Sequence, residues 1–236
     1  MTRSLNVPAR VKEHLDTLTR SLEGACGSNL ASLCVYGSAV RGGFVEGTSD
    51  VDLVVVLHDT AHERLTALSE PLMLANHAVR AEAMVLRLND LAPASDVFPL
   101  FYDDIKSCHA LLSGTDVWKD VSVTDTHRRL RIEQELREAK IRMHRAVVDA
   151  RGEDEALARF VSRKVTQIRS PLHALLTLQG TSCGESVEAV LDAFGKKAGV
   201  VTAPLKDVRT NPAAAHAAFR ALIDAAIEAT DRIEAK

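Results

Sequence analysis

Residues 36–57, YGSAVRGGFVEGTSDVDLVVVL, hold the features that decide the fold and the chemistry of this chain. A short apolar run ends in Gly37-Ser38, and a loop of glycines and small polar residues follows it. Asp50 and Asp52 then stand one residue apart at the head of the apolar run VDLVVVL. Because residues i and i+2 of a strand point to the same side, the two carboxylates are predicted to project together from one strand end.

Two neighbouring carboxylates repel each other, which raises a pKa and costs stability unless a partner is present. A divalent cation relieves the repulsion, and Mg²⁺ commonly uses one or two carboxylates together with substrate phosphates. Glu82 is the natural third acid if its apolar run forms the neighbouring strand. It would bridge a metal and take the proton of an attacking hydroxyl, in a site with two ions. The structural alternatives are an Asx cap for the aspartates and an edge-strand acid that faces water for Glu82.

The turn before the loop is suited to bind the phosphates of the same substrate. Gly37 lets the backbone approach closely, and a helix that starts near Ser38 would direct N–H groups at a phosphate. Ser38 adds its hydroxyl. The spacer between Ser38 and Asp50 is 11 residues, so a phosphate cradle and a metal site are predicted within one stretch.

The first half of the chain alternates amphipathic helices with short apolar strands. The VDLVVVL run is apolar on both faces, which is typical of a strand covered by a layer on each side. Pro71 predicts a break or kink in its helix. The predicted helices span residues 8–24 and 63–79, and the predicted strands span 30–37, 51–57 and 81–88.

The pattern becomes entirely helical from about residue 124. A long helix is predicted up to Gly152, one or two helices up to Gly180, and two more in the remainder. The fold class is therefore predicted to be α+β, with a small mixed sheet and helices in an N-terminal domain, 1–118, and an all-helical C-terminal domain, 119–236.

Charge and composition limit the classes of partner that this protein is expected to bind. Residues 1–118 carry 9 Lys/Arg and 15 Asp/Glu, and residues 119–236 carry 20 and 17. A net charge of −3 and 4% aromatic residues make bulk binding of nucleic acid unexpected. The sequence has no apolar run of signal-peptide or membrane-spanning type, which predicts a cytoplasmic protein without a membrane partner. No feature indicates an oligomeric state.

Two other charged groups are predicted to be mainly structural. Asp103 and Asp104 are adjacent, so on a helix they do not share a face, and a helix N-cap is predicted for them. The basic residues between Arg128 and Arg145 are interleaved with glutamates, which is typical of a solvated helix with ion pairs. The alternative is that some of these arginines reach a triphosphate.

The stretch YGSAVRGGFVEGTSDVDLVVV resembles the signature of the DNA polymerase β-type nucleotidyltransferase superfamily. The shared pattern is an apolar strand, Gly-Ser, a spacer of about a dozen residues and Asp-x-Asp at the start of a strand. Within the superfamily it is most similar to the bacterial aminoglycoside adenylyltransferases and their relatives, in which YGSAV-x-GG precedes SD-x-D. The resemblance covers residues 28–90 well and the rest of the chain loosely.

This resemblance implies an enzyme, a Mg²⁺-dependent nucleotidyltransferase that moves a nucleotide, usually AMP from ATP, to an acceptor hydroxyl and releases pyrophosphate. By position, Gly37 and Ser38 would hold the triphosphate, Asp50 and Asp52 the metals, and Glu82 the third-carboxylate role. Residues 1–118 would be the polymerase β-like catalytic domain, and the helical residues 119–236 would bind the acceptor.

Two loop residues are further candidates for nucleotide binding. Arg41 follows GSAV, where it either reaches a phosphate or only solvates the loop. Ser49 precedes the acids and either contacts a phosphate or metal-bound water, or only satisfies backbone groups.

The acceptor is not inherited with the fold. An aminoglycoside is one candidate, but such polycations favour an acidic surface and the second half is not acidic. Nucleotides, other small molecules and a protein hydroxyl stay open. The alternative function is non-catalytic: a nucleotide-binding or antitoxin-like regulatory protein of the same fold. The intact acids argue against it, and a purely helical interaction protein is the third class.

Overall fold

The apolar run after the two aspartates forms strand β2, Val51–Leu57, in the computed structural model, which describes residues 3–233. Alternate residues of this strand enter two different cores. Leu53 and Val55 belong to one buried cluster, and Val54 and Val56 belong to a second. The strand is therefore covered on both faces, as its unbroken apolar pattern predicts.

A four-stranded mixed sheet surrounds β2, with the strand order β3-β2-β1-β4. Strand β1, Leu30–Tyr36, runs antiparallel to β2, and β3, Ala81–Arg87, runs parallel to it. A parallel pair needs a crossover, and the helices α3, His62–Thr66, and α4, Ser69–Val79, supply it. The predicted strands and the α+β class are confirmed.

The edge strand β4, His109–Gly114, is not among the predicted strands. It pairs antiparallel with β1. Its sequence HALLSG contains no β-branched or aromatic residue, so its strand character comes from pairing and not from local preference.

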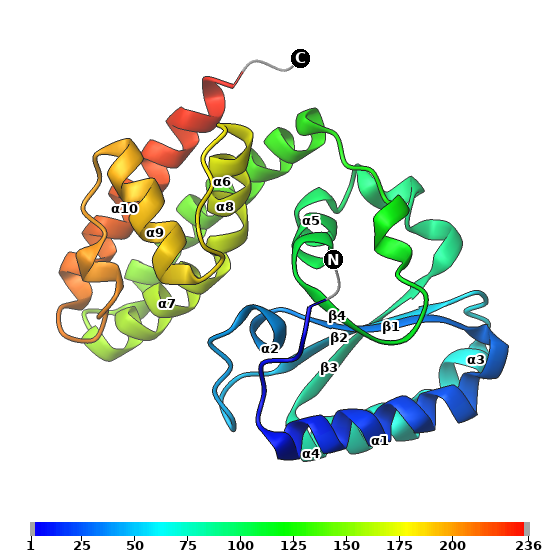
Figure 1. Cartoon of the computed structure of the whole chain (residues 1–236). Coiled ribbons are helices and arrows are strands. Elements are labelled where there is room, and N and C mark those ends of the chain that lie inside the picture. The colour runs from blue at the N-terminus through cyan, green and yellow to red at the C-terminus, as the bar shows by residue number, and fades with distance from the viewer. Residues whose placement is uncertain (1–2, 234–236) are drawn as a thin grey trace. The chain divides into compact units, whose positions relative to one another are not determined.

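Helices cover both faces of the sheet (Figure 1). Helix α1, Ala9–Cys26, and α4 lie on one face, and α1 buries the predicted apolar spacing of Val11, Leu15, Leu18 and Leu22. Helix α5, Pro99–Ser107, lies on the opposite face beside the turn η4, Val117–Asp120.

Two local predictions need correction. Asp103 and Asp104 lie inside α5 and not at its N-cap, because Pro99, which suits the first helical turn, starts the helix earlier. The break between α3 and α4 precedes Pro71, which sits in the first turn of α4, where its missing N–H costs no hydrogen bond.

The rest of the described chain is helical, as predicted. A long helix, α6, begins after the Thr124 side chain, which caps it, and ends just before Gly152, whose φ is 83°. The helices are α6, Asp125–Ala150; α7, Asp154–Gln167; α8, Arg169–Leu178; α9, Val187–Ala198; and α10, Pro212–Asp231.

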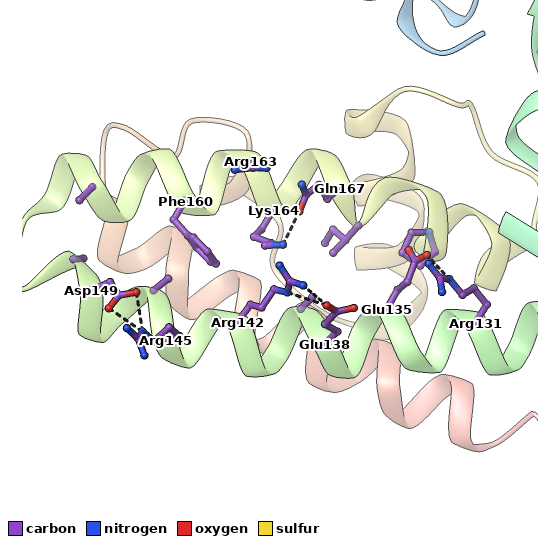
Figure 2. A pocket seen from close by; sticks show the side chains of 16 residues that line it. Arg131, Glu135, Glu138, Arg142, Arg145, Asp149, Phe160, Arg163, Lys164 and Gln167 are labelled. Atoms are coloured by element: carbon purple, nitrogen blue, oxygen red, sulfur yellow. Dashed lines mark hydrogen bonds and ion pairs between the residues drawn. The ribbon is translucent and has the colours of Figure 1, made fainter. Parts of the chain in front are cut away.

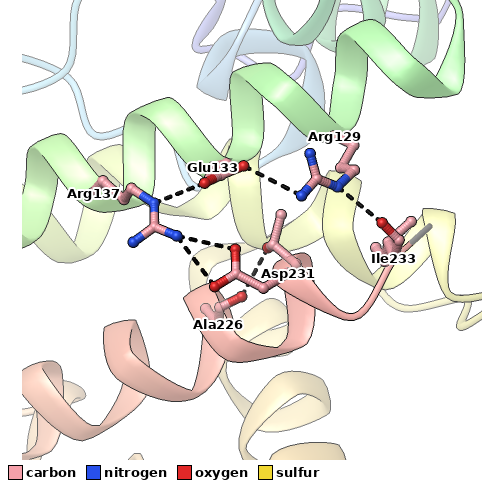
Figure 3. A network of polar contacts seen from close by, with 7 residues as sticks. Arg129, Glu133, Arg137, Ala226, Asp231 and Ile233 are labelled. Atoms are coloured by element: carbon pink, nitrogen blue, oxygen red, sulfur yellow. Dashed lines mark hydrogen bonds and ion pairs between the residues drawn. The ribbon is translucent and has the colours of Figure 1, made fainter. Parts of the chain in front are cut away.

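A polar network joins α6 to the C-terminal end of α10 (Figure 3). Arg137 donates to Glu133 at 2.8 Å and to both oxygens of Asp231 at 3.1 Å. Arg129 donates to the Ile233 carbonyl at 2.9 Å. These basic residues of α6 are therefore partnered within the helical half, as the interleaved charges predict.

The chain divides into two compact units, Met1–Val123 and Thr124–Lys236. Trp118, Val121 and Val123 pack into the second core of the first unit, so the division lies a few residues after the predicted boundary at 118/119. None of the helices described between residues 3 and 233 is long and apolar enough to cross a membrane.

The substitution Leu53→Ala tests the central position of β2. Leu53 is fully buried, so we expect the cavity to lower the free energy of unfolding by about 2–5 kcal/mol. Urea unfolding followed by tryptophan fluorescence measures this in the first unit alone, because the single tryptophan, Trp118, is fully buried there. Met84→Ala on β3 is the control, since Met84 is 43% exposed. Equal losses in the two variants would contradict the central placement.

Candidate active site

Three acidic residues meet where β2 and β3 begin. The two strands are parallel, and Asp52 pairs in register with Glu82. Paired residues of neighbouring strands project to the same side of the sheet, so Glu82 lies beside Asp52. Asp50 lies two residues before Asp52, just ahead of β2. The structure thus brings together the three acids that the sequence singles out.

Asp52 lies on the face of the sheet that α5 covers. It alternates with the core residues Leu53 and Val51 and shares its side with Val54. Burial raises the pKa of Asp52 most strongly, and the charges of Asp50 and Glu82 add to the increase, while Arg41 acts in the opposite direction; the resulting pKa is about 6. The Asp52 carboxylate therefore lies at the edge of the apolar cluster on this face, where its ionised form is unfavourable without a cation.

Gly37 forms the turn that closes against Asp52. Its φ of 70° and ψ of −148° lie in a region that only glycine adopts readily. A Cβ atom built on Gly37 would overlap Oδ2 of Asp52. Ser38 follows as the first residue of α2, Ser38–Arg41, and is half-buried. A helix therefore begins at Ser38 as predicted, and the glycine permits the close approach of turn and carboxylate.

The two loop candidates differ in their surroundings. The Arg41 side chain is only 11% exposed and lies 3.9 Å from Asp104 of α5, so it does not simply solvate the loop. The Ser49 hydroxyl accepts a hydrogen bond from the Val45 N–H at 3.0 Å and thereby stabilises the turn before the acids. A role for either residue in nucleotide binding stays a prediction.

Arg80 is the residue that the sequence reasoning missed. Its guanidinium donates to Oδ1 of Asp50 from Nε at 2.8 Å and from a terminal nitrogen at 2.7 Å. Arg80 also has a φ of 55°, one of two positive values among the non-glycine residues described. The sequence contains no signal for this, because glycine or asparagine is the usual choice at a left-handed helix end. The contact of Asp104 with Arg41 is likewise not indicated by the sequence, which predicts a helix cap for Asp104.

The donor set of this corner fits Mg²⁺. Within residues 3–233 no group of three or more His, Cys, Asp or Glu side chains is already arranged around a metal position. The Arg80 guanidinium instead occupies the place of a cation on Asp50. Three carboxylates offer hard oxygen donors, and Asp50 already binds the positive charge of Arg80. Such a set of donors suits a divalent ion. Asp50, Asp52 and Glu82 are the residues that would hold it.

The close contact at Gly37 predicts a large effect of Gly37→Ala. The added methyl group must displace either the turn or the Asp52 side chain, so we expect a loss of about 2–4 kcal/mol in the free energy of unfolding of the first unit. Gly43→Ala is the matched control: its φ is also positive, at 86°, but its Cβ would meet open space. Urea unfolding followed by Trp118 fluorescence compares them, and equal losses would show that the Asp52 contact contributes nothing.

The raised pKa predicts that ionised Asp52 destabilises the metal-free protein. The native state holds this proton more tightly than the unfolded state, so stability falls as the pH rises from about 4 to about 6. In a chelating buffer Asp52→Asn is expected to be more stable than the parent protein at about pH 7, by about 1–2 kcal/mol after screening. The difference should vanish near pH 4. Asp16→Asn, at an exposed position of α1, is the control, and a pH-independent difference at Asp52 would contradict the assignment.

Comparison with known proteins identifies the family and the fold. The family described as nucleotidyltransferase domain matches residues 19–141. The crystal structure of spectinomycin adenyltransferase AAD(9) from Enterococcus faecialis with ATP and spectinomycin is similar, with a TM-score of 0.57 and 12% sequence identity. The match covers 94% of this chain and 99% of that one. At this identity the likeness shows a shared fold. Curated proteins give no significant match.

The family match spans more than half of the chain and includes Gly37, Asp50, Asp52 and Glu82. The mixed sheet followed by helices is also the fold of the similar adenyltransferase. The chain belongs to the nucleotidyltransferase domain family and is an enzyme of the transferase class.

Proposed function

We propose that this enzyme transfers AMP from ATP to a hydroxyl group of a small-molecule acceptor and releases pyrophosphate. The observation that carries the proposal is the in-register pairing of Asp52 and Glu82 on adjacent parallel strands, beside the Gly37 turn. The family match supports nucleotidyl transfer, and the similar structure with bound ATP supports adenosine triphosphate as the donor.

Each residue of the corner has a task in this reaction. The Gly37-Ser38 turn binds the triphosphate, because glycine allows close approach of the backbone and Ser38 offers a hydroxyl. Arg41, at the end of α2 and close to Asp104, and Ser49, in the turn before the acids, orient the phosphates. These assignments are part of the proposal.

The bond changes are those of an in-line displacement. The acceptor oxygen forms a new bond to the α-phosphorus, the bridging bond to the β-phosphate breaks, and pyrophosphate leaves with that electron pair. Glu82 takes the proton of the attacking hydroxyl; it is exposed at the strand start, so an acceptor can reach it. Asp50, Asp52 and Glu82 would hold Mg²⁺, two ions in a site of this type, and the ions would supply positive charge to stabilise the attacking and leaving oxygens.

Small molecules with several hydroxyl groups are the acceptors to test first. Spectinomycin heads the panel because the similar adenyltransferase structure contains it, and aminoglycosides follow. Polycationic acceptors favour acidic surroundings, which the first half of this chain supplies with 15 Asp/Glu against 9 Lys/Arg. Neutral polyols, nucleosides and anionic metabolites complete the panel.

Glu82→Gln is expected to lower the rate of pyrophosphate release from ATP and Mg²⁺ by about 10²–10⁴-fold with a productive acceptor, because the amide cannot accept the proton. Asp52→Asn is expected to lower it at least as much. Glu70→Gln is the matched control, an exposed acid on α4 outside the acidic corner, and its rate should equal that of the parent enzyme.

Thermal shift separates the alternatives. An enzyme of this type is stabilised by ATP with Mg²⁺, and Asp52→Asn weakens the stabilisation. Stabilisation without pyrophosphate release from any acceptor would favour the non-catalytic, regulatory function instead. No response to ATP would refute both nucleotide-dependent functions.

A further inference from the structure

The helical unit contains a pocket of about 700 Å³, between α6 and α7 and closed at one end by the start of α8 (Figure 2). This volume lies within the usual range of sites for small molecules, about 300–1,000 Å³. Every lining residue belongs to the helical unit, between Arg131 and Pro171. The pocket is therefore built from residues of the helical unit alone, and none of the three acids contributes to its lining.

The lining carries more positive than negative charge, although the chain as a whole has a net charge of −3. Five cationic side chains and three acidic ones face the pocket. Three of the cations are partnered along α6: Arg131 with Glu135, Arg142 with Glu138, and Arg145 with Asp149.

Arg163 and Lys164 of α7 make up the surplus. Neither forms an ion pair with an acid of the described chain; Lys164 donates instead to Gln167 at 2.6 Å and lies 5.9 Å from the centre of the Phe160 ring. Figure 2 shows the Lys164 and Arg142 side chains approaching each other across the gap between α7 and α6. Burial lowers the pKa of Lys164, and the charges of Arg142 and Arg163 lower it further, while the charge of Glu138 acts in the opposite direction. Arg142, Arg163 and Lys164 thus all line the pocket, and of these three cations only Arg142 is paired with an acid of the described chain.

Two surplus charges match one phosphate group, which carries about −1.5 to −2 at neutral pH. The remaining wall is apolar and includes small alanine side chains, Ile168 and the half-buried ring of Phe160. A ring or other flat apolar group can pack there while a charged end meets the cations. The same surplus repels a polycation, so the pocket does not suit an aminoglycoside.

We propose that this pocket binds a small phosphate monoester, whose phosphate is held by Arg142, Arg163 and Lys164 and whose body packs against Phe160. The proposal is argued from the helical unit alone and does not rest on the proposed nucleotidyl transfer.

Pyridoxal 5′-phosphate is a suitable probe, because it joins a phosphate to a flat ring that carries an aldehyde. The aldehyde condenses with a neutral lysine amine to give an imine and water, and added borohydride reduces the imine to a stable adduct. The full-length protein is treated with limiting probe, and the modified lysines are identified by peptide mass spectrometry. Because the readout is the modified residue, phosphate binding in the first unit does not register.

We expect Lys164 to be the lysine most heavily labelled, about tenfold above labelling by pyridoxal, which lacks the phosphate. Arg163→Gln should lower this labelling about tenfold. Arg159→Gln is the matched control, an exposed arginine one turn earlier on α7 that pairs with Glu155 and lies outside the lining, and it should change nothing. Asp52→Asn should also label normally, which separates this proposal from the proposed function.

Phenyl phosphate, a plain monoester, should protect Lys164 more strongly than inorganic phosphate does. Equal protection would overturn the claim that the pocket holds an ester body. Labelling by pyridoxal equal to that by the phosphate, or labelling of Lys164 no greater than that of Lys140, would overturn the anion site as a whole. Lys140 also lies on α6 but pairs with Asp224 at 2.6 Å.

Discussion

The repulsion among three carboxylates at the starts of β2 and β3 is the constraint on which the chemistry of this protein depends. Asp52 stands beside the buried apolar cluster on its face of the sheet, and Glu82 is its neighbour in register. Such an arrangement costs stability in the isolated protein, since burial and like charges raise the pKa of Asp52 to about 6. A cost of this kind is typical of a functional site, where a ligand supplies the missing charge.

The protein offsets part of this cost with its own cations. Arg80 covers one oxygen of Asp50, and the charge of Arg41 lowers the pKa of Asp52. The Arg80–Asp50 pair is partly exposed, with side chains 55% and 37% accessible, so it contributes little stability and can be exchanged for another cation. A weak internal partner of this type leaves the acids available to a stronger external one.

In the helical unit the charged side chains to be balanced are mainly basic, in contrast to the acidic corner of the first unit. The basic residues of α6 are mostly matched by glutamates one turn away or by acids of α10. In the pocket between α6 and α7, five cationic side chains face three acidic ones, so positive charge exceeds negative. The two units therefore suit ligands of opposite charge. The acidic corner of the first unit suits cations, and the basic pocket of the helical unit suits an anion.

The sequence by itself determined the class of fold, the strand that carries the aspartates and the three acids, because periodicity and the Gly-Ser and Asp-x-Asp spacing are local. Tertiary structure alone decided what surrounds them. The Arg80 contact with Asp50, the Arg41 contact with Asp104 and strand β4 each join segments that are distant along the chain and lack a local signal. Side-chain partners across such distances are selected by packing, which no short stretch of sequence records.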